Sequence, residues 1–189
     1  GIVSDLHASP APLREALSLF RQQAVDLILC AGDIVGYGNE LDETVDLLVE
    51  SGCQSIMGNH EAWFLENTNE TDTAVWHYIE SLPRTRALDL EGIKLHMVHA
   101  SPPDAYNGGI RLLNQKCELD PEQLAKWTDQ LAPCDCDVLI VGHTHQVYAE
   151  TLANLLVVNP GSTAYNNSCA ILTLPDSKVE FLPLSGKKI

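Results

Sequence analysis

The sequence predicts an α/β fold in which parallel strands are joined by helical crossovers. Short apolar runs alternate with amphipathic segments along the first half of the chain, which is the order that strand–helix–strand units produce. Each of the first three apolar runs ends in polar residues. Because ligands collect beyond the carboxyl ends of parallel strands, we expect these polar residues to belong to one site.

The elements of the first half follow from apolar spacing and from residues typical of helix ends. Ser9 precedes Pro10 in the positions of an N-cap and a first helical residue, and Gly52 closes the second helix. Strands are expected at residues 2–4, 25–31 and 53–57. Helices are expected at residues 10–24, 41–51 and 62–82, the last with Trp63, Trp76 and Ile79 as apolar contacts.

The second half is expected to be richer in strands and to belong to the same domain, which would span residues 1–189. Residues 88–98 form a hairpin around Glu91-Gly92, and Asp120-Pro121 begins a helix. Further strands are expected at residues 138–141, 148–152, 155–158, 169–174 and 179–184.

Composition excludes several classes of function. The chain has 11 Lys and Arg against 26 Asp and Glu, a net charge of −15, which disfavours non-specific binding to nucleic acid or anionic membranes. No apolar run approaches the length of a transmembrane helix. The six cysteines are too dispersed for a disulfide scaffold, so we expect reduced thiols and a cytoplasmic location. Because the chain opens at Gly1 almost inside a strand, we expect further residues to precede it.

Residues with metal-ligating or acid–base chemistry gather at the predicted strand ends. In an extended segment residues two apart point the same way, so Asp5 with His7, and His143 with His145, can each present paired ligands. Imidazole and carboxylate suit divalent Mn, Fe, Ni or Zn, and seven such groups exceed the needs of one ion, so two are expected, with Asp33 as the bridging candidate. The full set is Asp5, His7, Asp33, Asn59, His60, His99, His143 and His145.

In this order, five short motifs resemble those of the calcineurin-like metallophosphoesterase family. They are Asp5-x-His7, Gly32-Asp33, Gly58-Asn59-His60-Glu61, His99 and Gly142-His143-x-His145. The segment 158–162 is similar to the family's closing strand and turn, and the length is similar to that of its small single-domain prokaryotic phosphodiesterases. The chain departs from the pattern after His7, where Ala8-Ser9 replaces the Gly-Asn of many members.

The resemblance implies a four-layer α/β/β/α sandwich of two mixed sheets flanked by helices, with the metals at one edge. It also implies a division of the ligands. Asp33 would bridge both ions, and His60 would stand beside the phosphate without binding metal. One ion, Mn being the favoured metal, would be held by Asp5, His7 and His145, and the other by Asn59, His99 and His143.

The chemistry expected of such a site is hydrolysis of a phosphate ester. Two divalent ions with two carboxylates leave about +2 of charge, which attracts a phosphoryl group. The hypothesis is in-line attack by a metal-bridging hydroxide, with His60 protonating the leaving oxygen, a contribution of order 10²- to 10⁴-fold. The substrates would be small phosphodiesters or phosphomonoesters, nucleotides included. Two alternatives are a phosphoprotein phosphatase and a non-catalytic metal-binding scaffold, such as the retromer subunit built on this fold.

Several neighbouring residues are expected to be structural instead. His77 and His96 fall outside the motifs, and Cys134-x-Cys136 has no second pair to complete a metal site. Glu61 is expected to support the start of a helix or a ligand. Gly32, Gly58 and Gly142 are expected to relieve crowding beside ligands. Residues 100–109 and the helical stretch 63–78 should line the substrate side.

Overall fold

The computed structural model describes residues 1–69 and 71–185, which form two mixed β-sheets packed face to face. The first sheet has the order β10-β9-β1-β2-β3, and its strands are Ile2–Val3 (β1), Leu29–Cys30 (β2), Gln54–Ser55 (β3), Ser168–Thr173 (β9) and Lys178–Pro183 (β10). The second has the order β4-β5-β6-β8-β7, and its strands are Thr85–Leu90 (β4), Ile93–Val98 (β5), Val138–Ile140 (β6), Val147–Leu152 (β7) and Leu155–Pro160 (β8).

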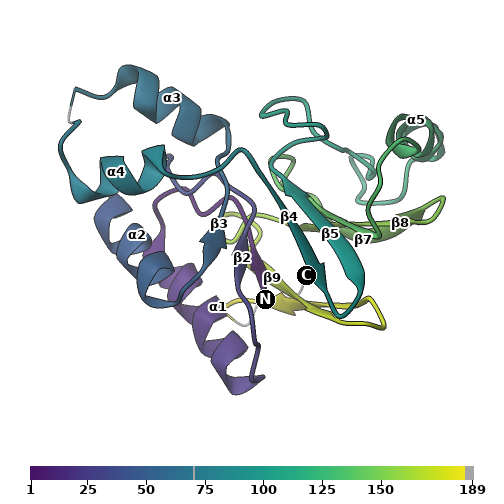
Figure 1. Ribbon diagram of the computed structural model, residues 1–189, viewed down its shortest axis with the longest axis horizontal. Helices are drawn as coiled ribbons and strands as arrows, with labels where there is room; N and C mark the ends of the chain where they lie inside the picture. Colours follow the sequence, from purple (N-terminus) through teal and green to yellow (C-terminus); the bar gives the residue numbers. More distant parts are fainter. Residues whose placement is uncertain (70, 186–189) are drawn as a thin grey trace.

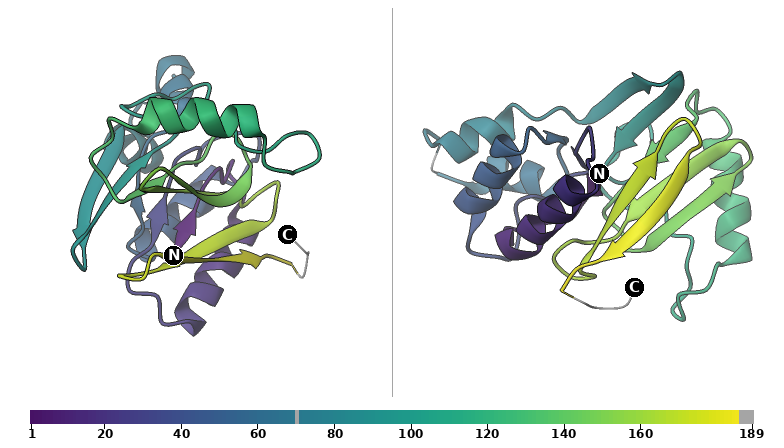
Figure 2. Two further views of the ribbon diagram at one scale, coloured as in Figure 1. Left: turned by 90° about the vertical axis from the view of Figure 1, so that its right-hand side faces the viewer. Right: turned by 90° about the horizontal axis from the view of Figure 1, so that it is seen from below.

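Helices cover the outer face of each sheet, so the predicted four-layer sandwich is confirmed. The left view of Figure 2 shows the layers in order, with the green helix α5 over the second sheet and the purple helix α1 beneath the first. In Figure 1, α1, α2 and α4 lie together on the first sheet. The helices are Pro10–Gln22 (α1), Leu41–Glu50 (α2), Asn59–Asn67 (α3), Ala74–Glu80 (α4) and Pro121–Leu131 (α5).

Three apolar clusters separate these layers. The central cluster joins the two sheets through buried side chains such as Ile2, Leu29, Met97 and Val138. A second cluster packs α1, α2 and α4 on the first sheet, and a third packs α5 on the second. Burial of this apolar surface is the main favourable contribution to folding, and it fixes the two sheets relative to each other.

Parallel pairing brings the strand ends to one edge. Strand β1 pairs in parallel with β2, and β2 with β3, while β6 pairs in parallel with β5 and β8. The polar segments that follow β1, β2, β3, β5 and β6 therefore leave the two sheets from their carboxyl ends. This is the arrangement that the repeated strand–polar tip–helix order predicts.

The structure corrects three local predictions. Strand β2 has only two residues rather than the run 25–31, because β1 offers it only Ile2 and Val3 as ladder partners. The helical stretch 62–82 is two helices, and Thr73 caps the second by accepting a hydrogen bond from the backbone N of Trp76. Ser9 is an N-cap by position, but its hydroxyl donates to the carbonyl of His7 and caps no helical amide.

The hairpin and the fifth helix follow their predictions. Strands β4 and β5 pair on either side of Glu91-Gly92. The side chain of Asp120 accepts hydrogen bonds from the backbone N of Glu122 and Gln123, which satisfies the free amides at the start of α5. Among the described residues, no helix is long and apolar enough to cross a membrane.

Candidate metal centre

The first group of candidate ligands comes from the loops after β1 and β6. Asp5 Oδ1 lies 3.2 Å from His145 Nε2, and His7 Nε2 lies 3.3 Å from the same nitrogen. Asp5 and His7 are buried, and His145 is half-buried. The backbone N of His143 donates to both carboxylate oxygens of Asp5 at 3.1 Å, which fixes the carboxylate in this position. The group Asp5, His7 and His145 can therefore bind one cation.

The second group is built around Asp33, which follows β2. His99 Nε2 lies 3.3 Å from Asp33 Oδ1 and 3.2 Å from Asn59 Oδ1. His143 Nδ1 lies 2.9 Å from the same amide oxygen of Asn59. The other ring nitrogen of His99 faces the carbonyl of Ala31 at 2.7 Å, so a proton on Nδ1 leaves Nε2 free to bind a metal.

His60 lies between the two groups. Its Nε2 is 3.9 Å from Asp33 Oδ2, whereas the Nε2 atoms of His99 and His145 lie 3.3 Å and 3.2 Å from a carboxylate oxygen. The backbone N of His60 donates to Asp33 Oδ1 at 3.0 Å. His7, Asp33 and His60 form a third set whose ligand atoms all lie within 4.8 Å of one another. Because Asp33 and His7 each belong to two of the three sets, the whole cluster is continuous.

The backbone of the ligand loops differs from the prediction that paired ligands would stand on extended segments. Asp5 (φ 53°), His7 (φ 47°), Asp33 (φ 54°), His143 (φ 61°) and His145 (φ 55°) are all in the left-handed region. The paired ligands do converge, but turns rather than strand alternation bring them together. Conformations of this kind are rare for residues other than glycine and are concentrated at functional sites.

Glu61 connects two of the ligand loops. Its fully buried carboxylate accepts hydrogen bonds from the backbone N of Asp33 (2.8 Å), Val35 (2.7 Å) and Gly58 (2.6 Å). The loop after β2 is thereby joined to the start of α3. This supports the expectation that Glu61 positions a ligand and does not itself bind the metal.

Two glycines allow the loops to approach the carboxylates. A Cβ on Gly58 would collide with the carboxylate and backbone of Asp33, and one on Gly142 would collide with Ser4 Oγ and with Asp5 Oδ2. Any larger residue at either position would displace a candidate ligand.

The titration of the cluster favours a positive charge beside Asp33. Burial lowers the pKa of His99, but its hydrogen bond to Asp33 and the charge of that carboxylate outweigh burial and raise the pKa to about 9. Burial raises the pKa of Asp33, yet the hydrogen bond and charge of His99 bring it down to about 2. For His7 and His143, burial lowers the pKa, which favours the neutral imidazole that metal binding needs.

The donor set fits divalent transition metals. It contains two carboxylates, one amide oxygen and four or five imidazoles, with ring nitrogens and carboxylate oxygens facing a common space. His7 Nδ1 is buried with no hydrogen-bond partner, so this ring has a polar atom that the described residues leave unsatisfied. Mixed nitrogen and oxygen ligands of this kind suit Mn, Fe, Ni or Zn.

Sequence reasoning missed the residues around the rim and floor of the cluster. The ring of Tyr165 stacks on His145 at 5.5 Å, and Tyr37 lies 5.0 Å from the ring of His60. Ser162 donates from its hydroxyl to the carbonyl of Asp5 at 2.7 Å. Ser162 lies in the segment 158–162 that was expected to close the fold, whereas nothing in the sequence points to the two tyrosines.

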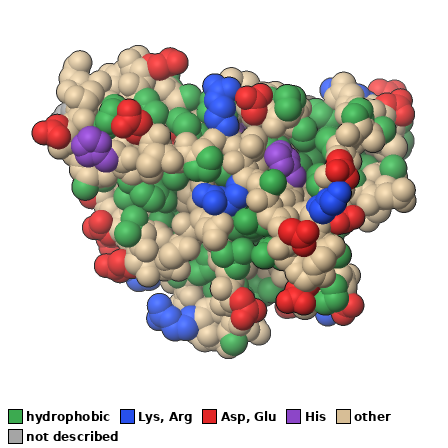
Figure 3. Space-filling view, in the orientation of Figure 1, with side chains coloured by type: hydrophobic (Ala, Val, Ile, Leu, Met, Phe, Trp, Pro, Cys, Tyr) green, Lys and Arg blue, Asp and Glu red, His purple; other side chains and the backbone are tan. Residues whose placement is uncertain are grey.

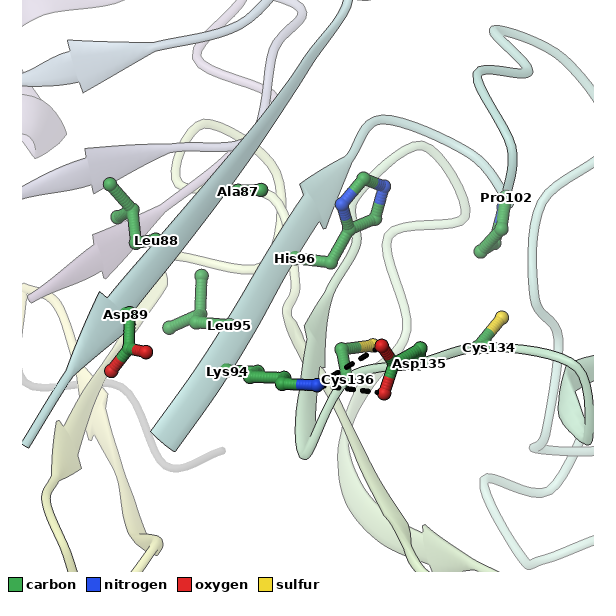
Figure 4. Close-up of a pocket in the computed structure, with 10 residues that line it drawn as sticks. All are labelled: Ala87, Leu88, Asp89, Lys94, Leu95, His96, Pro102, Cys134, Asp135 and Cys136. Carbon is green, nitrogen blue, oxygen red and sulfur yellow. Dashed lines mark hydrogen bonds and ion pairs between the residues drawn. The ribbon is translucent and has the colours of Figure 1, made fainter. Parts of the chain in front are cut away.

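A separate cavity of about 460 Å³ lies on the outer face of the β4–β5 hairpin (Figure 4). His96 and Lys94 border it on β5, and Lys94 pairs with Asp135 between Cys134 and Cys136. None of these residues belongs to a set of three metal-ligating side chains in the described chain, and His77 belongs to none either. On the face in Figure 3, lysines and arginines are few and interspersed with acidic side chains.

Comparison with known proteins agrees with this geometry. Residues 1–176 match the model of the calcineurin-like phosphoesterase superfamily domain. The chain belongs to this superfamily. A "probable metallophosphoesterase" of Methanothermobacter thermautotrophicus is 28% identical over 193 residues, covering all of this chain and 87% of the relative.

Solved structures of the superfamily share the fold. A metallophosphoesterase from Sphaerobacter thermophilus has a TM-score of 0.69 and 25% identity, covering 95% of this chain and 85% of its own. A novel archaeal phosphodiesterase has a TM-score of 0.62 and 19% identity, covering 97% of this chain and 98% of its own. This calcineurin-like protein therefore combines the fold of its superfamily with a cluster of candidate metal ligands.

Proposed function

We propose that this calcineurin-like protein acts as a single domain over residues 1–189 and is a dinuclear metal-dependent phosphoesterase of small phosphodiesters or phosphomonoesters, nucleotides included. The observation that carries the proposal is the position of Asp33. Its Oδ1 faces His99 and its Oδ2 faces His60, in a set that also includes His7. A carboxylate placed between two ligand groups is what a bridged pair of ions requires.

The two ligand groups divide around that carboxylate. Asp5, His7 and His145 would hold one ion, and Asn59, His99 and His143 the other. Two divalent ions, with Mn favoured and Fe, Ni or Zn also compatible, would activate water as the nucleophile and neutralise the phosphoryl oxygens. The ligands supply only two negative charges, from Asp5 and Asp33, so the loaded site would attract an anion in an otherwise acidic protein.

His60 is proposed as the acid that assists the leaving group. Its ring nitrogen is farther from Asp33 than that of His99, and His60 also lines a cavity that, among the candidate ligands, includes only Asn59. The hydrogen bond from its own backbone N to Asp33 ties the start of α3 to the bridging carboxylate. His60 can therefore reach a leaving oxygen on the cavity side while the other histidines bind metal.

The experiment that tests the proposal is hydrolysis of bis-p-nitrophenyl phosphate and p-nitrophenyl phosphate by chelator-stripped protein before and after addition of Mn²⁺. We expect turnover that depends on the metal. His60→Ala should retain two ions by elemental analysis and lose about 10²- to 10⁴-fold in turnover. His77→Ala, which removes an exposed histidine on α4, is the matched control and should behave as wild type.

Each possible result distinguishes one alternative from the proposed function. Loss of an ion in His60→Ala would make His60 a ligand, and full turnover would remove it from the reaction. Two bound ions without turnover of either ester would favour the non-catalytic scaffold, and turnover of phosphopeptides alone would favour a phosphoprotein phosphatase. The cytoplasmic location stays a prediction from the dispersed cysteines, all of which are unpaired in the structure.

A further inference from the structure

A cavity of about 790 Å³ opens beside His60. Its walls come from the loop after β2, from helix α3 and from the segments around residues 84 and 106. A volume of this size is typical of small-ligand sites. The lining includes His60 and Asn59 but not Asp5 or His145, so the cavity adjoins His60 and the second ligand group.

Aromatic side chains are exposed in this part of the molecule. Among the described residues, the exposed aromatic side chains are Tyr37 (72% exposed), Trp63 (63%) and Tyr165 (54%). Tyr37 and Trp63 line the cavity, and Tyr165 stacks on His145 at the rim. Keeping large apolar rings in water is unfavourable, so their gathering around one site indicates a ligand that covers them.

Trp63 is placed one helical turn from His60. Residues three apart on a helix share a face, and both side chains border the cavity from α3. A group that leaves from an oxygen beside His60 would therefore extend along α3 toward the Trp63 indole. Sequence analysis expected the helical stretch 63–78 to line the substrate side, and the place of Trp63 in this lining agrees with that expectation.

Arg84 and Tyr106 also line the cavity and form a stacked pair. The Arg84 guanidinium lies 4.6 Å from the centre of the Tyr106 ring, and it pairs with Asp104 at 3.0 Å. Because Asp104 neutralises Arg84 and Glu66 adds a negative charge to the lining, the cavity does not favour a further phosphate. Guanidinium and indole planes instead suit a planar ring, which stacks on both kinds of surface.

We propose that this cavity is the leaving-group subsite and that it takes a nucleoside, whose base stacks on Trp63 with the Arg84–Tyr106 pair as a second platform. The role of the nucleoside as a leaving group rests on the proposed phosphoesterase activity. Binding of a nucleoside in the cavity does not depend on that activity. The preferred substrate is then a phosphate ester that releases an uncharged nucleoside, in preference to one that releases an alkyl alcohol or a nucleotide with further phosphates.

The test measures binding of adenosine to the Mn²⁺-loaded protein by calorimetry, with ribose as the base-free probe. We expect adenosine to bind and ribose to bind far more weakly. Trp63→Ala should weaken adenosine binding by about 5- to 150-fold, the range that loss of one base–aromatic stack produces, while Trp63→Phe retains most of it. Leu119→Ala removes an exposed apolar side chain outside the cavity and should leave binding unchanged.

Kinetics then locate the bound nucleoside. Adenosine should inhibit hydrolysis of bis-p-nitrophenyl phosphate competitively, with an inhibition constant equal to its dissociation constant. Adenosine and ribose binding alike, Trp63→Ala binding as wild type, or non-competitive inhibition would each overturn the inference while turnover persists. Trp63-dependent adenosine binding without any turnover would support the base-binding cavity and would count against the proposed function.

Discussion

Replacing Glu61 by Gln is expected to weaken the metal centre without removing a proposed ligand. The wild-type carboxylate is fully buried, and its oxygens accept three backbone amides, two at Oε2 (from Asp33 and Gly58) and one at Oε1 (from Val35). Gln has nearly the same shape, but one of its two terminal atoms is an NH₂ group that cannot accept. The better orientation keeps the oxygen at the Oε2 position, where it still accepts from Asp33 and Gly58. The backbone N–H of Val35 then faces the NH₂ group of the glutamine and has no acceptor.

The cost can be worked from these contacts. One unsatisfied buried donor costs about 1–3 kcal/mol, and loss of charge assistance weakens the two remaining hydrogen bonds by roughly 1 kcal/mol each. Burial and the charge of Asp33 raise the pKa of Glu61 to about 7, so removing its negative charge relieves part of this cost. We expect a net loss of about 2 kcal/mol in the free energy of unfolding. Supporting residues of this kind also change metal affinity by about 10- to 100-fold.

The assay is urea unfolding at pH 8 of chelator-treated protein, followed by tryptophan fluorescence, with Mn²⁺ affinity measured by calorimetry. Glu50→Gln, on the exposed face of α2, is the matched control and should change stability by less than about 0.5 kcal/mol. A Glu61→Gln protein that unfolds as the control does and binds Mn²⁺ as wild type would refute the assignment of Glu61 as the residue that positions Asp33.

Three further substitutions test other parts of the site. Asp33→Ala should reduce bound metal from two ions to at most one and abolish turnover, as measured by elemental analysis and ester hydrolysis. Gly58→Ala should lower Mn²⁺ affinity by about 10- to 100-fold in a calorimetric titration, because the added methyl group collides with Asp33. Asn159→Ala should lower the free energy of unfolding by about 3 kcal/mol in urea, because buried Asn159 donates to the carbonyl of Gly142 and accepts from the amide of Gly161.

The identity of the candidate ligands could be predicted because they follow buried strands. Hydrophobic runs mark where a parallel strand ends, and the carboxyl ends of such strands share an edge, so residues as distant as Asp5 and His143 were expected together. The backbone N of His143 donates to the carboxylate of Asp5 at 3.1 Å, which agrees with that expectation. The two mixed sheets came from the family resemblance, because apolar spacing does not say which sheet a strand joins.

Details that depend on tertiary partners could not be predicted. Strand β2 ends where β1 has no more residues to pair with, which its own apolar run does not reveal. The stretch from Trp63 onward was expected to line the substrate side, but its apolar spacing did not reveal that the chain breaks between α3 and α4. Tyr37 lies in a loop with no periodic pattern, so only the packing of that loop against His60 shows that it borders the site.

The left-handed backbone of Asp5, His7 and Asp33 shows why the loops that carry them depend on one another. Each such residue costs about 1–2 kcal/mol relative to an ordinary conformation, so an isolated loop would relax. Neighbouring loops prevent this, because Asp5 N donates to the carbonyl of Gly32 at 2.9 Å and His7 N donates to that of Asp33 at 3.0 Å. The loop after β2 therefore holds the ligands of the loop after β1, while Glu61 holds the loop after β2. A substitution at Glu61 should thus alter the positions of Asp5 and His7, although the amides that its carboxylate binds are those of Asp33, Val35 and Gly58.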